Sequence, residues 1–348
     1  MEETKQEKPI EQPKPVPKEP KENPIDRLVV SSSPHFSTED NVHKIMHTVI
    51  LALLPACAAS IYFFGLNALF LIITCIVACM ATEYAFQKIR SKPVTITDGS
   101  AIITGILLAL TLPPSFPLYA AVLGSVVAIG LGKQIFGGLG YNIFNPALLG
   151  RAFLQAAYPV LITTWSEPLT KAAKQGIDAV SAATPLALMK FEHKITPHLD
   201  LLFGNTAGSL GETSAIAIIL GGLYLRYKGY INWKMPLGYF GSIAVFGGIF
   251  WLVNPLKYPD PLFHMLAGGA MLGAWFMVTD MVTTPTTPIG QWIFVIVAGF
   301  LVVIIRLLGG LPEGVMYSIL LMNAFTPLIN RHTRPKVFGE GGQGGLTG

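Results

Sequence analysis

The segment Ile45–Gly65, IMHTVILALLPACAASIYFFG, is apolar along nearly its whole length. An α-helix needs about 20 predominantly apolar residues to cross the hydrocarbon core of a bilayer, and this segment is long enough. A second apolar segment of similar length, Ala68–Ile89, follows almost at once. The two segments together predict α-helices that span a membrane.

The composition of the whole chain agrees with this prediction. The chain has 348 residues, of which 51% are hydrophobic and 13% charged, and its mean hydropathy is +0.53. Soluble domains contain about 25% charged residues, so this composition is typical of an integral membrane protein. The net charge of +4 does not indicate a nucleic-acid partner, because the basic residues lie beside apolar segments rather than in one patch. We therefore predict an all-α polytopic membrane protein in contact with the lipid bilayer.

The rest of the chain contains further apolar segments, about ten in all, and several approach the length of a membrane span. They are Ile45–Gly65, Ala68–Ile89, Ser100–Leu112, Leu118–Phe136, Ile143–Ile162, Thr213–Arg226, Pro236–Val253, Leu262–Thr279, Gly290–Arg306 and Val315–Ile329. Ser100–Leu112 and Val315–Ile329 are too short to cross unaided. The first ends at Pro113-Pro114 and the second contains Pro327, so both are predicted to be broken helices. Broken helices are tolerated in a membrane only where they face protein or a polar cavity.

The two halves of the chain share a pattern of turn residues. Gly137–Gly140 (GGLG) lies between the fourth and fifth segments, and Gly309–Pro312 (GGLP) lies between the ninth and tenth. Phe144-Asn145-Pro146 after the first turn resembles Phe325-Thr326-Pro327 after the second. Five crossings in each half would give two inverted five-helix halves, as in many transporters. Glycine and proline also recur by chance at helix breaks, so the repeat is a hypothesis.

Basic residues between the segments predict the orientation of the chain. If every apolar segment crosses the membrane, five groups of basic residues lie on the same side of it. They are Lys44, Lys88/Arg90/Lys92, Lys133, Arg226/Lys228/Lys234 and Arg331/Arg334/Lys336. Because Lys and Arg are enriched in cytoplasmic loops, we predict cytoplasmic termini and an external loop after the fifth segment. The predicted units are a disordered cytoplasmic tail (1–40), a first half (41–164), the external loop (165–212), a second half (213–330) and a cytoplasmic tail (331–348).

The external loop contains the stretch Asp178–Leu186, DAVSAATPL. Threonine is a favoured N-cap and proline is favoured at the first helical position, so Thr184-Pro185 predicts a short helix continuing to Phe191. A helix N-terminus favours a bound phosphate, and the small residues from Ser181 to Ala183 would let a flat, bulky group approach the backbone. An ordinary capped loop helix has the same features, so the pattern alone leaves both interpretations open.

Other polar residues in the membrane region are weaker candidates. Cys75 and Cys79 share a helix face, but two thiols without further ligands are more often buried apolar residues, so we predict no metal site. Asp98 is predicted to cap the third segment. Asp280 follows a span in a threonine-rich break, and acids at membrane depth often belong to ion paths, although a capping role explains it equally well. The chain has no Walker loop, Rossmann fingerprint or Ser-His-Asp arrangement, so no catalytic residue is predicted.

Three motifs resemble the RnfD/NqrB family. They are Thr97–Gly105 (TDGSAIITG) continuing to Pro113-Pro114, Gly132–Gly140 (GKQIFGGLG) leading to Phe144–Leu148 (FNPAL), and Thr279–Pro288 (TDMVTTPTTP) followed by Gln291. The resemblance covers most of the membrane region. In this family, RnfD is the membrane subunit of the Rnf complex, an ion-pumping ferredoxin:NAD oxidoreductase. NqrB is its counterpart in the sodium-pumping NADH:quinone oxidoreductase.

The resemblance implies a covalent flavin. In this family FMN is joined through its phosphate to a threonine that closes a Ser/Thr-Gly-Ala-Thr motif, and a flavin transferase installs it. Here the motif reads Ser181-Ala182-Ala183-Thr184, with Asp178 ahead of it and Ala182 in place of the glycine. The resemblance therefore assigns FMN to Thr184. It also implies a second, non-covalent flavin, such as riboflavin, whose place the sequence does not indicate.

The resemblance further implies an electron-relay subunit that is inactive alone and takes part in translocation of Na+ or H+. Its expected partners are the other Rnf subunits (A, B, C, E and G), and its expected location is the bacterial cytoplasmic (inner) membrane. RnfD fits better than NqrB, because NqrB-like chains have a longer N-terminal region. An NqrB-type subunit, or a channel or transporter on the same inverted halves, remains an alternative.

Overall fold

The structure is a computed structural model that describes residues 40–170 and 182–335. The tail predicted to be disordered (1–40) therefore lies outside the described residues except for Asp40, and Asp178 and Ser181 lie outside them too. Within the described part of the chain, every regular element is a helix and no β-strand occurs. The prediction of an all-α fold is confirmed.

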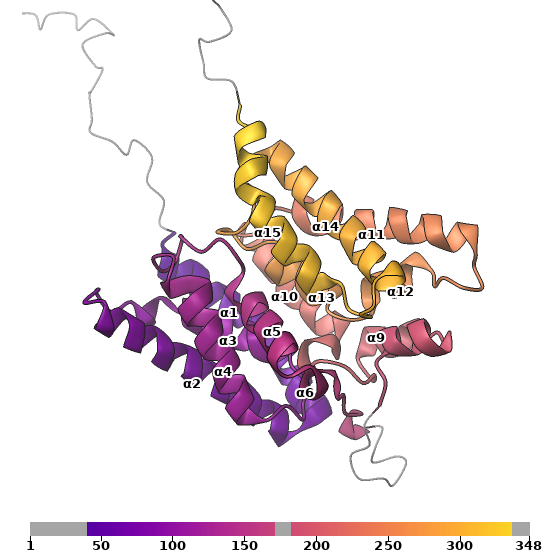
Figure 1. The fold of residues 1–348 in the computed structure, drawn as a ribbon, viewed down its shortest axis with the longest axis horizontal. Helices are drawn as coiled ribbons and strands as arrows, with labels where there is room; N and C mark the ends of the chain where they lie inside the picture. The colour runs from indigo at the N-terminus through magenta and orange to yellow at the C-terminus, as the bar shows by residue number, and fades with distance from the viewer. Residues whose placement is uncertain (1–39, 171–181, 336–348) are drawn as a thin grey trace, which may run out of the picture. The chain divides into compact units, whose positions relative to one another are not determined.

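Each half of the chain supplies one group of helices. The first group is α1 (Val42–Phe64), α2 (Leu66–Ile89), the short turn η2 (Ile96–Asp98), α3 (Ser100–Leu110), α4 (Leu118–Ile129) continuing into the π-helical turn η3 (Gly130–Gln134), α5 (Pro146–Ala157) and α6 (Pro159–Thr163). The second group is α10 (Ala215–Tyr227), α11 (Lys234–Val253), α12 (Pro261–Leu266), α13 (Ala270–Leu272) with the π-helical turn η6 (Gly273–Met277), α14 (Pro288–Leu308) and α15 (Val315–His332). Figure 1 shows the first group in indigo to magenta and the last helices of the second in orange to yellow.

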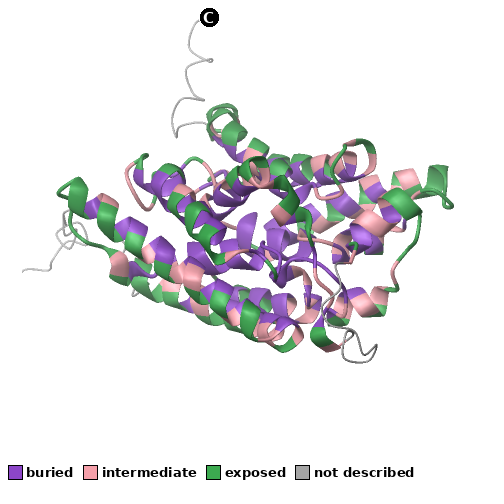
Figure 2. Ribbon diagram, turned by 60° about the horizontal axis from the view of Figure 1, so that its bottom comes forward, coloured by how far each residue is buried: buried purple, intermediate pink, exposed green. Residues whose placement is uncertain are grey.

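Four of these helices, α1, α2, α11 and α14, are long and apolar enough to cross a membrane. Shorter apolar helices lie at Ser100–Leu110, Leu118–Gln134 and Ala215–Tyr227. The outward faces of the long helices carry exposed apolar side chains, such as Val77 on α2 and Val245 on α11. Figure 2 shows the buried residues gathered in the interior, between helices whose outer surfaces are exposed. Exposed apolar faces of this extent suit contact with lipid, so a polytopic membrane protein is confirmed.

The two groups repeat one packing pattern. In the first, α2 packs against α3 and α4, and α4 packs against α5. In the second, α11 packs against α12 and α14, and α14 packs against α15. The groups meet where α1 packs against α10 and α5 against α15. The predicted repeat is therefore present in the arrangement of the helices.

The helices α1 and α10 run in opposite directions. Near the end of α1, the Ser60 hydroxyl donates to the carbonyl of Leu210, just before α10 begins, at 2.7 Å. In the middle of both helices, a Cβ atom built on Gly221 would lie 2.0 Å from the carbonyl oxygen of Ala52. Because α1 and α10 are the first helices of their halves, their antiparallel contact agrees with inverted halves.

Some details differ from the sequence-based expectation. The helix α15 continues through Pro327 to His332 rather than breaking there. A proline inside a packed membrane helix removes one backbone hydrogen bond, which need not end the helix. The helix α5 begins at Pro146, so Pro146 and Pro327 are not equivalent, and that part of the proposed repeat is wrong.

Two apolar segments are divided. Ile143–Ile162 forms α5 and α6, with the break at Tyr158 just before Pro159. Leu262–Thr279 forms α12, α13 and η6. The helix α3 ends at Leu110, before Pro113-Pro114, as predicted.

The close contact between α1 and α10 gives a testable prediction. Gly221→Ala should destabilise the protein by about 1–3 kcal/mol, because the added methyl group overpacks against the backbone of α1. Gly241→Ala is the matched control, since Gly241 lies in α11 and a methyl group added there would meet open space. The control should be neutral or stabilise by up to about 1 kcal/mol through helix propensity. Thermal unfolding in detergent measures both variants, and equal stability would contradict this contact.

Candidate functional site

Thr184 forms the N-cap of a short helix, as predicted. The backbone N–H of Ala187 donates to Thr184 Oγ1 at 3.2 Å, and Pro185 occupies the first helical position of α8 (Pro185–Ala187). The π-helical turn η4 (Leu188–Glu192) continues the helix until His193, whose φ of 54° is left-handed. Two adjacent residues therefore determine where this helix begins. The Thr184 hydroxyl accepts from a free backbone N–H group of the first turn, and Pro185 has a fixed φ that suits the first helical position.

A cavity of about 370 Å³ lies beside the small residues of this motif. Ala182 and Ala183 line it, together with aromatic side chains from three segments, Trp165, Phe191 and Tyr317. Thr184 itself is only 2% exposed. The cavity therefore offers flat apolar surfaces next to a buried hydroxyl group.

Lys190 holds this helix against the end of α14. Its ammonium group donates to the backbone carbonyls of Arg306 at 3.1 Å and Leu311 at 3.0 Å, and also to that of Gly309. The Arg306 carbonyl lies in the last turn of α14 and the other two lie just beyond its C-terminal end, where a positive charge is favourable. Partial burial lowers the pKa of Lys190 from its ordinary value. The contacts fix the Thr184 helix beside the Gly309–Glu313 turn.

A second cavity, of about 140 Å³, lies between the two halves. Thr104, Asn142 and Asn145 line it from the first half, and Trp275 and Asp280 line it from the second. Most of its wall is apolar, with a few polar groups, as is common in small-molecule sites. Sequence reasoning missed Asn142 and Asn145 as candidates, although both lie in the segment between the GGLG turn and α5.

Asp280 has partners of its own in the turn before α14. The backbone N–H of Val282 donates to Asp280 Oδ1 at 3.2 Å, and the Thr283 hydroxyl donates to Oδ2 at 3.0 Å. Burial raises the pKa of Asp280 above its ordinary value. The carboxylate therefore organises its turn, and it also lines the cavity between the halves.

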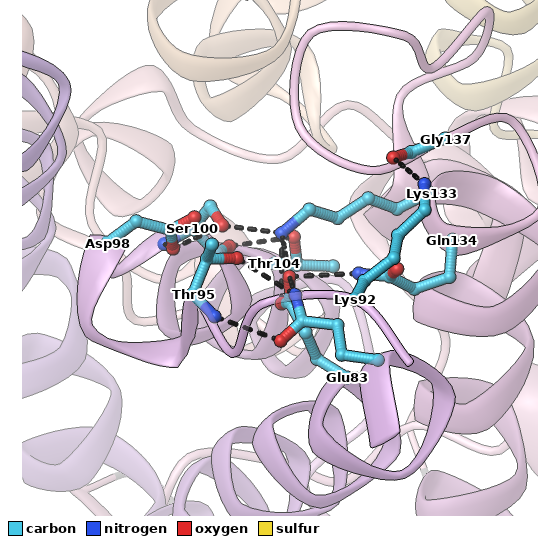
Figure 3. A network of polar contacts seen from close by, with 10 residues as sticks. Glu83, Lys92, Thr95, Asp98, Ser100, Thr104, Lys133, Gln134 and Gly137 are labelled. Carbon is cyan, nitrogen blue, oxygen red and sulfur yellow. Dashed lines mark hydrogen bonds and ion pairs between the residues drawn. The ribbon is translucent and has the colours of Figure 1, made fainter. Parts of the chain in front are cut away.

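A buried ion pair in the first half was not predicted. Lys133 of η3 donates to both carboxylate oxygens of Glu83 of α2, at 2.7 and 2.9 Å, and both side chains are almost fully buried. Lys133 also donates to Ser100 Oγ, and the Gln134 amide donates to Glu83 at 2.9 Å. Figure 3 shows this network joining α2, α3 and η3. Acids at membrane depth are candidates for function, and this one already has a cation as its partner.

Asp98 joins the same network through Ser100. Its Oδ1 accepts from the backbone N–H of Ser100 at 2.8 Å and from the Ser100 hydroxyl at 2.6 Å. The N-cap residue of α3 is Gly99 rather than Asp98, so Asp98 closes the turn before α3 instead of capping the helix as the sequence had predicted. Cys75 and Cys79 are buried, and no group of three or more potential metal ligands occurs in the described part of the chain.

Comparison with known proteins gives consistent matches along the chain. The model of the NQR2, RnfD, RnfE family matches residues 29–339. The chain is similar to the D subunit of the proton-translocating ferredoxin:NAD(+) oxidoreductase complex of Clostridium ljungdahlii, with 49% identity over 322 residues, 90% of this chain and 96% of the relative. It is 48% identical over 317 residues to the D subunit of the Na(+)-translocating ferredoxin:NAD(+) oxidoreductase complex of Acetobacterium woodii, covering 90% of this chain and 95% of the relative. It is 40% identical over 332 residues to the D subunit of the ion-translocating oxidoreductase complex of Stutzerimonas stutzeri, covering 87% of this chain and 94% of the relative.

The buried ion pair gives a prediction for stability. Lys133→Met should destabilise the protein by about 3–5 kcal/mol, because it leaves the Glu83 carboxylate buried without a cation. The double variant Glu83→Gln/Lys133→Met should recover much of this loss, since no buried charge remains. Lys194→Met is the control, because Lys194 pairs with Glu192 at the surface, where solvent screens the pair, so this substitution should leave the stability nearly unchanged. Denaturation in detergent compares the variants. A double variant as unstable as Lys133→Met would contradict the explanation by charge.

Proposed function

The chain belongs to the NQR2, RnfD, RnfE family, and we propose that it is the D subunit of an ion-translocating ferredoxin:NAD oxidoreductase complex. The similarity to three such subunits extends over most of this chain and of each relative. The described helices and their apolar outer faces suit a subunit embedded in the cytoplasmic membrane. In this role the chain relays electrons and takes part in ion movement alongside the other subunits, and it does not turn over ferredoxin or NAD alone.

We propose that FMN is attached through its phosphate to Thr184. The observation that carries this proposal is the Ser181-Ala182-Ala183-Thr184 motif, which ends where a helix begins. The N-terminus of that helix favours the negative charge that a phosphodiester retains. The adjacent cavity, with its aromatic walls and small alanines, is suited to the flat isoalloxazine ring. FMN would supply reversible electron transfer, and the chain supplies placement and electrostatics.

The burial of Thr184 has a consequence for maturation. A flavin transferase must reach a hydroxyl group that is only 2% exposed. The segment that carries it is held by Lys190 at the end of α14 and by Leu186, which packs close to Gly268. We therefore infer that the transferase acts on this segment while it is displaced from α14.

We further propose that the cavity between the halves takes the second, non-covalent flavin. The aromatic side chain of Trp275 offers a stacking surface for a flavin ring. Asn145 Oδ1 already accepts from the backbone N–H groups of Ala147 and Leu148, and Asn142 Nδ2 donates to the carbonyl of Phe144. The Asn145 NH2 group can therefore donate and Asn142 Oδ1 can accept, which suits the alternating polar groups at one edge of that ring. The cavity thus combines an apolar wall with a few orienting polar groups.

The transported ion is a separate question from the fold. The first two relatives named above differ by only one percentage point in their identity to this chain, yet one name specifies protons and the other Na+. Overall sequence similarity therefore does not indicate which ion this chain helps to transport.

We propose Asp280 as a residue of the ion path, because it combines a partly buried carboxylate with a position on the cavity between the halves. The orientation that we propose has cytoplasmic termini and an external Thr184 segment, from the distribution of basic residues.

Thr184→Ala tests the covalent flavin. When the wild-type subunit is produced with its flavin transferase, the denatured chain should fluoresce under ultraviolet light on a gel, because a covalent bond survives denaturation. Thr184→Ala should remove this signal while costing only about 1 kcal/mol of stability through the lost cap. Thr184→Ser retains a hydroxyl and a cap, so loss of flavin from that variant would reflect recognition by the transferase. Fluorescence that persists in Thr184→Ala would place the flavin elsewhere.

Asp280→Asn tests the ion path. The amide retains an oxygen that can accept from the turn, so the variant should assemble normally in the complex. It cannot ionise, so ion transport per transferred electron should fall. Transport into vesicles and NAD reduction are measured on the same preparation. Unchanged transport per electron would leave Asp280 with only its role in the turn.

A further inference from the structure

A second cluster of buried charges lies between the halves, apart from the sites described above. Arg151 of α5 donates to Glu313, in the turn before α15, and to the backbone carbonyl of Thr111. Glu212, in the turn η5 (Leu210–Glu212), and Arg306 of α14 lie close to this pair. Two guanidinium groups and two carboxylates thus face one another where the halves meet.

The four side chains surround a cavity of about 30 Å³. Arg306 is 1% exposed, and its terminal nitrogens donate to the carbonyls of His264 and Ala267, whereas its Nε–H has no partner in the described residues. Glu212 Oε2 accepts from the backbone N–H of Ser209 at 3.4 Å, whereas its buried Oε1 has no partner there. About 10–15 Å³ of such space is enough for one water molecule, so the cavity has room for water beside this donor and this acceptor.

The small cavity shares a wall with the cavity beside Ala182 and Ala183. Glu313 and Met316 line both. The Glu313 side chain is 23% exposed, so it connects the buried cluster with the cavity beside Ala182 and Ala183, called the outer cavity below. Glu313 and Met316 therefore lie between the cavity that contains Glu212 and the cavity proposed for the flavin, and the partly exposed Glu313 carboxylate is a polar group between the two.

Opposing influences act on the Glu212 carboxyl group. Burial and the Glu313 carboxylate raise the pKa of Glu212 to about 7, against the opposing effect of Arg151. Arg306 also faces Glu212 from α14, and Tyr317 of α15 faces the outer cavity. When every group is charged the cluster is neutral, so a further negative charge nearby is costly in a medium of low dielectric constant.

We propose that Glu212 is a proton-binding group that takes up one proton when the flavin on Thr184 gains one electron. The electron comes from the redox partners of the complex, and the proton comes from water at the outer face through the cavity shared by Glu313. The carboxylate becomes a carboxylic acid and no other bond changes, so the total charge of the region stays constant. Reoxidation of the flavin releases the proton. The coupling to the flavin rests on the proposed function, whereas the protonation of Glu212 does not.

Infrared titration of the complex tests the protonation itself. The wild type should show the carbonyl stretch of a buried carboxylic acid, with a shift in D₂O, and this band should disappear as pH rises through neutrality. Glu212→Gln should lack the band, and it should fold, because glutamine also completes a capping box with Ser209. Glu192→Gln, an exposed carboxylate in the Thr184 helix, is the control and should retain the band.

Several outcomes of this titration would overturn the proposal. Absence of the band in the wild type, or its persistence in Glu212→Gln, would do so even if the flavin is present. Loss of the band on adding Na+ at constant pH would show a cation site instead.

Redox titration tests the coupling. In the wild type, the midpoint potential of the covalent flavin should fall as pH rises through neutrality, and the dependence should be largely lost in Glu212→Gln. An identical dependence in both proteins would refute the coupling while leaving the infrared result intact. If the chain carries no covalent flavin, the infrared titration still decides whether Glu212 binds a proton.

Discussion

Two buried arginines close the ends of helices that stop inside the protein. Arg151 donates to the carbonyl of Thr111 at the end of α3, and Arg306 donates to the carbonyls of His264 and Ala267 at the end of α12. Carbonyls at a helix end lack intrahelical partners, and lipid offers none. Each arginine reaches a broken helix of its own half, so the breaks in both halves depend on the same kind of contact.

This arrangement determines where function can lie. Because the broken helices are closed by protein groups, their ends can meet in the interior and leave small polar cavities between the halves. The Thr184 helix docks on the same region, since Lys190 donates to the backbone carbonyl of Arg306 itself and to that of Leu311 in the turn after α14. A cofactor held there would lie within reach of the charged cluster, whereas the Glu83–Lys133 pair serves the first half separately.

Local patterns in the sequence predicted much of this structure, and long-range contacts account for what they missed. The helices α1, α2, α11 and α14 follow from apolar length alone, and the Thr184 cap follows from two adjacent residues. The sequence did not predict the ion pair between Lys133 and Glu83, because the two residues lie far apart in the chain and only the folded structure shows that both are buried. Pro327 was expected to break a helix that packing instead maintains. The position proposed for a second flavin could not be predicted from the sequence, because residues of both halves form the cavity and no single segment indicates it.

The mass of one peptide tests most directly whether this chain carries a covalent flavin. Tryptic digestion of the wild-type subunit, isolated from cells that contain its flavin transferase, should release Gln175–Lys190, which contains Thr184 and no internal lysine or arginine. We expect this peptide to be heavier by one FMN residue, and we expect fragmentation to assign the added mass to Thr184. An unmodified peptide as the main species, or flavin assigned to another residue, would contradict the claim that this chain is a covalent flavoprotein of the proposed kind.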